Sequence, residues 1–122
     1  MPYLPRMSKA PTHEIVETPA FTRQVKEVGV SEAELAAIYD LYAADPGYGK
    51  IVKNTGGLRK GRAAKDGGGK SGGYRVFSFF ADDHYPAFLL WIIDKAEDEN
   101  LTDAQEKAFK KVTAAVKAEL RK

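Results

Sequence analysis

The feature that most constrains this chain is a glycine-rich, cationic segment at residues 56–75, GGLRKGRAAKDGGGKSGGYR. Ten of the eleven glycines lie between Gly47 and Gly73. The window from Gly47 to Arg75 holds eight Lys or Arg residues and one acid, a net charge of +7, whereas the rest of the chain carries −5. Clustered cations attract polyanions and release counterions from a phosphate backbone. The sequence therefore predicts a loop-rich cationic region with a polyanionic partner.

Length and composition limit the remaining possibilities. A chain of 122 residues predicts one domain, and we expect it at residues 14–122 behind a flexible, proline-rich arm at residues 1–13. Met7 is an alternative start. No cysteine is present, which excludes disulfides and thiolate metal sites and fits a reducing cytoplasm. No apolar run approaches the roughly 20 residues of a membrane helix, and the N-terminus lacks the apolar core of a signal peptide.

Three helices are predicted from their end signals. Thr18 as N-cap and Pro19 at the first helical position begin a helix that Gly29 ends. Capping boxes at residues 31–34 (SEAE) and 102–105 (TDAQ) begin two more. The last helix is expected to bury an apolar stripe made of Ala108, Phe109, Val112, Ala115 and Val116.

Four strands are predicted, at residues 14–17, 58–64, 74–81 and 85–94, with a loop at residues 47–56. The last strand is apolar on both faces, which indicates a central position covered on both sides. The order β-α-α-β-β-β-α predicts an α+β fold. It would have a small antiparallel or mixed sheet of about four strands, with helices on one face and the other face partly open.

Side-chain alternation predicts a cationic face on this sheet. Lys60 and Arg62 share one face of their strand, Arg75 stands beside them on the next strand, and Lys95 follows the central strand. Such a face is tolerated when it is open and meets an anion. The alternative is a solvated strand edge whose charges block edge-to-edge pairing.

The same segments resemble a known family. The motifs are EIVETPAFTRQV at 14–25, GGLRK at 56–60, GKSGGYRV at 69–76, FLLWIIDK at 88–95 and NLT at 100–102. In this order and spacing they are similar to the RelE/HigB superfamily of bacterial type II toxins, and to its HigB-like branch in particular. The chain departs from the family's pattern at Gly61 and Ala63, which are often larger and apolar in relatives. It also has no tyrosine after Tyr85.

This resemblance implies a ribosome-dependent endoribonuclease that cleaves mRNA in the ribosomal A site and inhibits translation. It also implies an inhibitory antitoxin, DNA-binding and encoded adjacently, as partner. Arg62 and Arg75 would stabilise the pentavalent phosphorane, and Lys60 or Lys95 would act as acid or base or hold phosphate. Further contacts to mRNA or ribosomal RNA would come from Arg59, Lys65 and Lys70. No metal or cofactor is expected.

Two other functions are open on sequence grounds. Glu97, Asp98 and Glu99 follow Lys95 where many relatives carry basic residues, which favours a non-catalytic RNA- or ribosome-binding module of the same fold. Alternatively, the basic loop serves only a protein partner, in a structural interaction protein.

Overall fold

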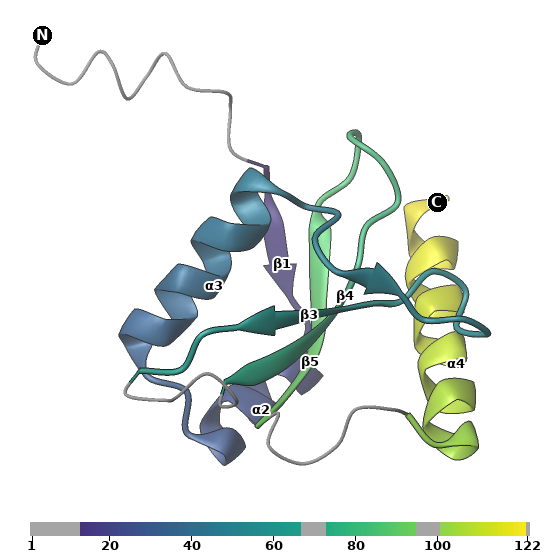
Figure 1. Cartoon of the computed structure of the whole chain (residues 1–122). Coiled ribbons are helices and arrows are strands. Elements are labelled where there is room, and N and C mark those ends of the chain that lie inside the picture. The colour runs from purple at the N-terminus through teal and green to yellow at the C-terminus, as the bar shows by residue number, and fades with distance from the viewer. Residues whose placement is uncertain (1–12, 67–72, 95–100, 122) are drawn as a thin grey trace, which may run out of the picture.

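The computed structural model describes residues 13–66, 73–94 and 101–121, arranged as an α+β fold (Figure 1). This confirms the predicted fold class. The elements in chain order are β1 (Ile15–Glu17), α2 (Pro19–Val28), α3 (Glu32–Ala44), β2 (Lys50–Ile51), β3 (Arg59–Ala63), β4 (Tyr74–Phe79), β5 (Ala87–Asp94) and α4 (Asp103–Leu120). Of the expected arm, only His13 lies within the described residues. Its N–H donates to the carbonyl of Ala43 at 2.9 Å.

The helix ends follow the predicted local signals. The Thr18 side chain accepts from the N–H of Phe21, and Gly29 ends α2 in the left-handed conformation at φ 86°. Both capping boxes form, at Ser31 with Glu34 and at Thr102 with Gln105. Each cap satisfies backbone donors that would otherwise be left unpaired. No helix within the described ranges is long and apolar enough to cross a bilayer.

The sheet has five strands in the order β1-β5-β4-β3-β2, so the prediction of about four strands was one short. The missed strand, β2, lies in the expected loop and pairs Lys50 with Lys60 and Ile51 with Arg59. A strand is predicted from alternating buried and exposed positions. Because β2 has only two residues and both are exposed, it shows no such alternation. β1 pairs parallel to β5, and the other pairs are antiparallel.

Helices cover both faces of the sheet, so the prediction of helices on one face was wrong (Figure 1). α2 and α3 pack on the face that carries Tyr74, Val76 and Ile92. α4 packs on the opposite face, which carries Phe77 and Phe79. The reason lies in β4, whose six residues are all buried and therefore need cover on both sides. The expected central, doubly covered position of β5 is confirmed, since it lies between β1 and β4.

The buried stripe of α4 is rotated from the predicted one. Phe109 and Val116 pack on the sheet as expected, but Thr113 lies between them at 1% exposure. Its hydroxyl donates to the carbonyl of Thr55 at 2.6 Å. This contact turns the predicted Ala108, Val112 and Ala115 outward, and Val112 is 40% exposed.

Candidate functional site

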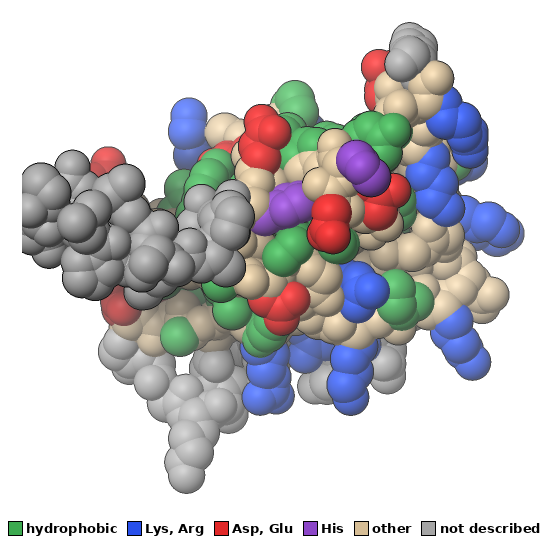
Figure 2. Space-filling model, turned by 90° about the horizontal axis from the view of Figure 1, so that it is seen from above, with side chains coloured by type: hydrophobic (Ala, Val, Ile, Leu, Met, Phe, Trp, Pro, Cys, Tyr) green, Lys and Arg blue, Asp and Glu red, His purple; other side chains and the backbone are tan. Residues whose placement is uncertain are grey.

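A cationic pocket of about 670 Å³ opens over the end of the sheet formed by β2, β3 and β4. It is lined by Tyr48, Gly49, Lys50, Lys60, Gly61, Arg62 and Arg75. Four of these seven residues are cations, and no acid is among the lining residues that the structure describes. Seen from above, most Lys and Arg side chains project from the lower and right-hand margins of the molecule, whereas most acids on this face lie toward the middle (Figure 2). The pocket is therefore suited to an anionic ligand.

Strand register brings three of the predicted site residues together. Arg62 pairs directly with Arg75 across β3 and β4, and Lys60 lies two residues earlier on the same face of β3. Arg62 is exposed and Lys60 is half-buried, whereas only 8% of Arg75 is exposed. A buried guanidinium presents its donors in a fixed orientation, which suits bidentate contact with phosphate oxygens.

The other predicted site residues lie elsewhere. Lys70 and Lys95 fall outside the described residues. Arg59 points away from the face of Lys60, and its Nη1 donates to the carbonyl of Gly49 at 3.1 Å. Lys65 forms an ion pair with Asp94 at 2.7 Å, which raises the pKa of the Lys65 ammonium. The RNA contacts expected of Arg59, Lys65 and Lys70, and the acid, base or phosphate-holding role expected of Lys95, stay predictions.

Four lining residues were not predicted as site residues: Tyr48, Gly49, Lys50 and Gly61. A Cβ atom added to Gly61 would lie 2.5 Å from Cε2 of Tyr48, so the Tyr48 ring occupies the space that a side chain at 61 would fill. The Tyr48 hydroxyl donates to the backbone carbonyl of Arg62 at 2.9 Å. A glycine within a strand often marks a close approach by another group, and this was the available sequence signal.

Gly49 forms part of the pocket wall for a similar reason. Its φ of 101° is left-handed, and an added Cβ would lie 2.6 Å from the carbonyl oxygen of Lys60. Only glycine avoids both the strained φ and this contact. The backbone of residues 49–50 therefore packs directly on β3 beside Lys60.

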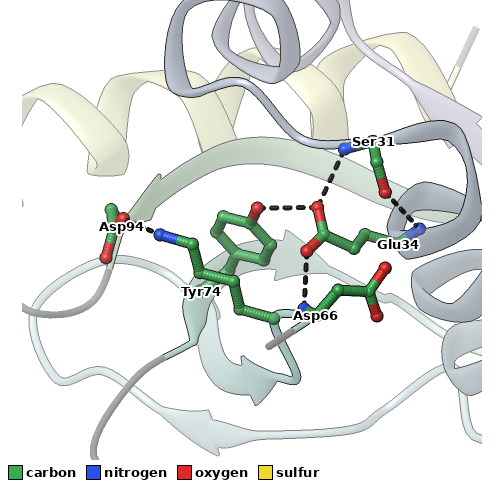
Figure 3. A network of polar contacts seen from close by, with 6 residues as sticks. Ser31, Glu34, Asp66, Tyr74 and Asp94 are labelled. Carbon is green, nitrogen blue, oxygen red and sulfur yellow. Dashed lines mark hydrogen bonds and ion pairs between the residues drawn. The ribbon is translucent and has the colours of Figure 1, made fainter. Parts of the chain in front are cut away.

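The strands of the pocket are anchored by a buried carboxylate at the start of α3 (Figure 3). Glu34 accepts from the N–H of Ser31 at 2.8 Å, the N–H of Asp66 at 2.7 Å and the hydroxyl of Tyr74 at 2.8 Å. These donors, the Ser31 N–H first among them, lower the pKa of Glu34 to about 2 despite its burial. Because Asp66 follows β3 and Tyr74 begins β4, Glu34 ties both strands to α3 at their linked ends.

The chemistry available in the pocket is charge stabilisation. Arginine forks bind phosphate oxygens, and a ring beside them offers a surface for a base, a combination found in single-strand nucleic-acid sites. Within the described ranges, no group of three His, Cys, Asp or Glu side chains is placed to hold a metal ion. The expectation of metal-independent chemistry stays a prediction.

Comparison with known protein families gives a match over residues 13–122. The matching family is described as the RelE toxin of the RelE / RelB toxin-antitoxin system. The matched range includes every described helix and strand and all the residues that line the pocket.

Proposed function

This chain belongs to the RelE toxin family, and from that premise we propose that it is a ribosome-dependent endoribonuclease that cleaves mRNA in the ribosomal A site. Membership makes the chain a toxin of a toxin–antitoxin system and gives it a cognate antitoxin as partner. The observation that carries the catalytic proposal is the convergence of Lys60, Arg62 and Arg75 on one pocket without a lining acid among the described residues.

The proposed reaction is attack by the 2′-hydroxyl of the RNA on its own phosphodiester. The 2′-oxygen loses its proton and bonds phosphorus, the bond from phosphorus to the 5′-oxygen breaks, and the leaving 5′-oxygen takes up a proton. The products are a 2′,3′-cyclic phosphate and a 5′-hydroxyl. Arg62 and Arg75 stabilise the charge on the phosphorane, and this charge stabilisation requires no metal ion or cofactor.

Lysines complete the proposed site. Lys60 lines the pocket and acts as acid or base or holds the phosphate, and we assign Lys95 to the same task. Contacts to mRNA or ribosomal RNA are proposed for Arg59, Lys65 and Lys70. The wider proposal is a HigB-like toxin with one domain at residues 14–122. It acts in the cytoplasm, and its antitoxin is DNA-binding and encoded adjacently.

Expression in cells tests this function. The chain is expressed alone and with the product of the adjacent gene, and the 5′ ends of cellular mRNA are mapped. We expect growth arrest with new 5′ ends in phase with codons, both relieved by the neighbour. Arg62→Ala should lose both effects, whereas Lys26→Ala, an exposed cation on α2, should keep them.

Normal growth with no new 5′ ends would remove catalysis from the proposal. If the purified chain then still binds ribosomes, a non-catalytic ribosome-binding module of the same fold takes its place.

A further inference from the structure

We propose that Tyr48, seated on Gly61, forms a nucleobase subsite next to the cationic pocket, in which the Tyr48 ring stacks on one base of the bound RNA. The inference rests on the proposed function and adds to it how a base is held while the cations hold phosphate. Single-strand sites combine a cationic groove with aromatic rings, because every base has a face that stacks.

The position of the ring depends on the glycine beneath it. A Cβ atom at residue 61 would fall 2.5 Å from Cε2 and 2.7 Å from Cδ2 of Tyr48. Both distances are far below a van der Waals contact, so any other residue at 61 would displace the ring. The tyrosine therefore lies directly on the backbone of β3, on the face opposite to the side chains of Lys60 and Arg62, which precede and follow Gly61.

The ring is held in one orientation before any ligand binds. Its hydroxyl donates to the Arg62 carbonyl at 2.9 Å. The ring also meets that of Tyr42 edge-on, with centroids 5.5 Å apart and planes at 89°. Tyr42 is fully buried and so forms a fixed support. A ring fixed in advance loses little conformational entropy when a base stacks on it.

The pocket reaches both faces of β3, so it includes this ring as well as the cations. Tyr48 is only half-buried, and it lines the pocket together with Lys60, Arg62 and Arg75. A volume of about 670 Å³ leaves room for a base as well as its phosphate. Because the hydroxyl is engaged by Arg62, the ring offers its aromatic surface, so the subsite holds a base without reading its identity.

The test separates stacking from a purely structural role by removing the base as well as the ring. Ribosomes are loaded with an mRNA whose A-site codon is intact or lacks one base, at each of the three positions in turn. Single-turnover cleavage is followed against toxin concentration for the unaltered chain, Tyr48→Phe and Tyr48→Leu. Tyr85→Leu, a half-buried tyrosine that does not line the pocket, is the matched control.

On the intact codon, Tyr48→Leu should weaken apparent affinity by roughly tenfold to a hundredfold, the worth of one stacked base. Tyr48→Phe should retain most of the affinity, and Tyr85→Leu all of it. At one codon position, removing the base should weaken the unaltered chain by a similar factor, and Tyr48→Leu should then cost nothing more. If Tyr48→Leu does not fold, Tyr48→Met, which fills the space with a flexible apolar side chain, replaces it.

An equal loss from Tyr48→Leu on intact and base-free codons at all three positions would overturn the subsite and leave the proposed function standing. If Tyr48→Leu loses no affinity on the intact codon, the subsite is likewise overturned and the proposed function stands. Failure of the unaltered chain to cleave on any ribosome complex would instead overturn the proposed function, and the subsite with it.

Discussion

Replacing Glu34 by glutamine should destabilise the fold by removing one anchor of the strands that carry Arg62 and Arg75. The carboxylate accepts three hydrogen bonds through its two oxygens, two at Oε1 from Ser31 and Tyr74 and one at Oε2 from Asp66. A glutamine keeps one acceptor oxygen in nearly the same shape. Its amide nitrogen, which donates, must then face at least one of the three donors.

The magnitude follows from these contacts. One hydrogen bond to a charged acceptor is lost, worth about 1.5–3 kcal/mol, and two become neutral, at a cost of roughly 0.5–1 kcal/mol each. The expected loss is therefore about 3 kcal/mol at pH 7. With a slope of about 2 kcal/mol per molar urea, the unfolding midpoint should fall by roughly 1.5 M.

The pH dependence gives an independent check. The folded-state pKa of Glu34 is about 2, below its ordinary value of 4.5. The stabilisation from this carboxylate is therefore fully present above pH 4.5 and is lost as pH falls through 2. The gap in stability between the unaltered protein and Glu34→Gln should hold at pH 7 and narrow below pH 4.5.

Urea unfolding followed by circular dichroism at pH 7, 4 and 2.5 measures both effects. Glu27→Gln, an exposed carboxylate on α2, serves as control and should leave the midpoint unchanged at pH 7. An unchanged midpoint for Glu34→Gln at pH 7, or a gap that does not narrow in acid, would refute the anchoring role.

Three further predictions concern the pocket and the packing around it. Arg62→Ala should weaken RNA binding and reduce the slope of log affinity against log salt concentration by about 0.7, as expected for one lost phosphate contact. The urea midpoint should not change, because the Arg62 side chain is exposed. Fluorescence anisotropy over a salt series measures the slope, and an unaltered slope would argue against the contact. Gly49→Ala should destabilise the fold more than Gly29→Ala does. Both residues have a left-handed φ, but only at Gly49 would an added Cβ lie 2.6 Å from a backbone oxygen. Equal urea midpoints for the two variants would contradict the close packing of residue 49. Thr113→Val should lower the free energy of unfolding by about 1–3 kcal/mol, because the buried carbonyl of Thr55 loses its hydrogen-bond donor. Calorimetry measures this change, and an unchanged free energy of unfolding would show that the bond does not stabilise α4.

The sequence predicted the features that depend on neighbouring residues. Each helix start depends on four consecutive residues, because the cap side chain accepts a hydrogen bond from the backbone N–H three positions later. The caps are Thr18, Ser31 and Thr102. The pairing of Arg62 with Arg75 also follows from simple alternation once two antiparallel strands are assumed. Thus three of the four cations that line the pocket could be predicted from the sequence, and Lys50 could not.

Features that depend on distant residues were not predictable. β2 exists only because Lys50 and Ile51 reach the edge of β3. The face of α4 is set by a hydrogen bond between Thr113 and Thr55, 58 residues apart, which overrides the more apolar line through Val112. The same holds for Glu34, whose bond to Tyr74 spans 40 residues.

Cleavage on purified ribosomes tests the central claim most directly. The unaltered chain is mixed with ribosomes that hold a defined codon in the A site, and the ends of the mRNA fragments are identified. We expect a cut within that codon that leaves a 2′,3′-cyclic phosphate. The cut should require the ribosome, and it should be lost when the antitoxin is added or when Arg62→Ala replaces the unaltered chain. An uncut mRNA, or equal cutting by Arg62→Ala, would contradict catalysis by the cationic pocket.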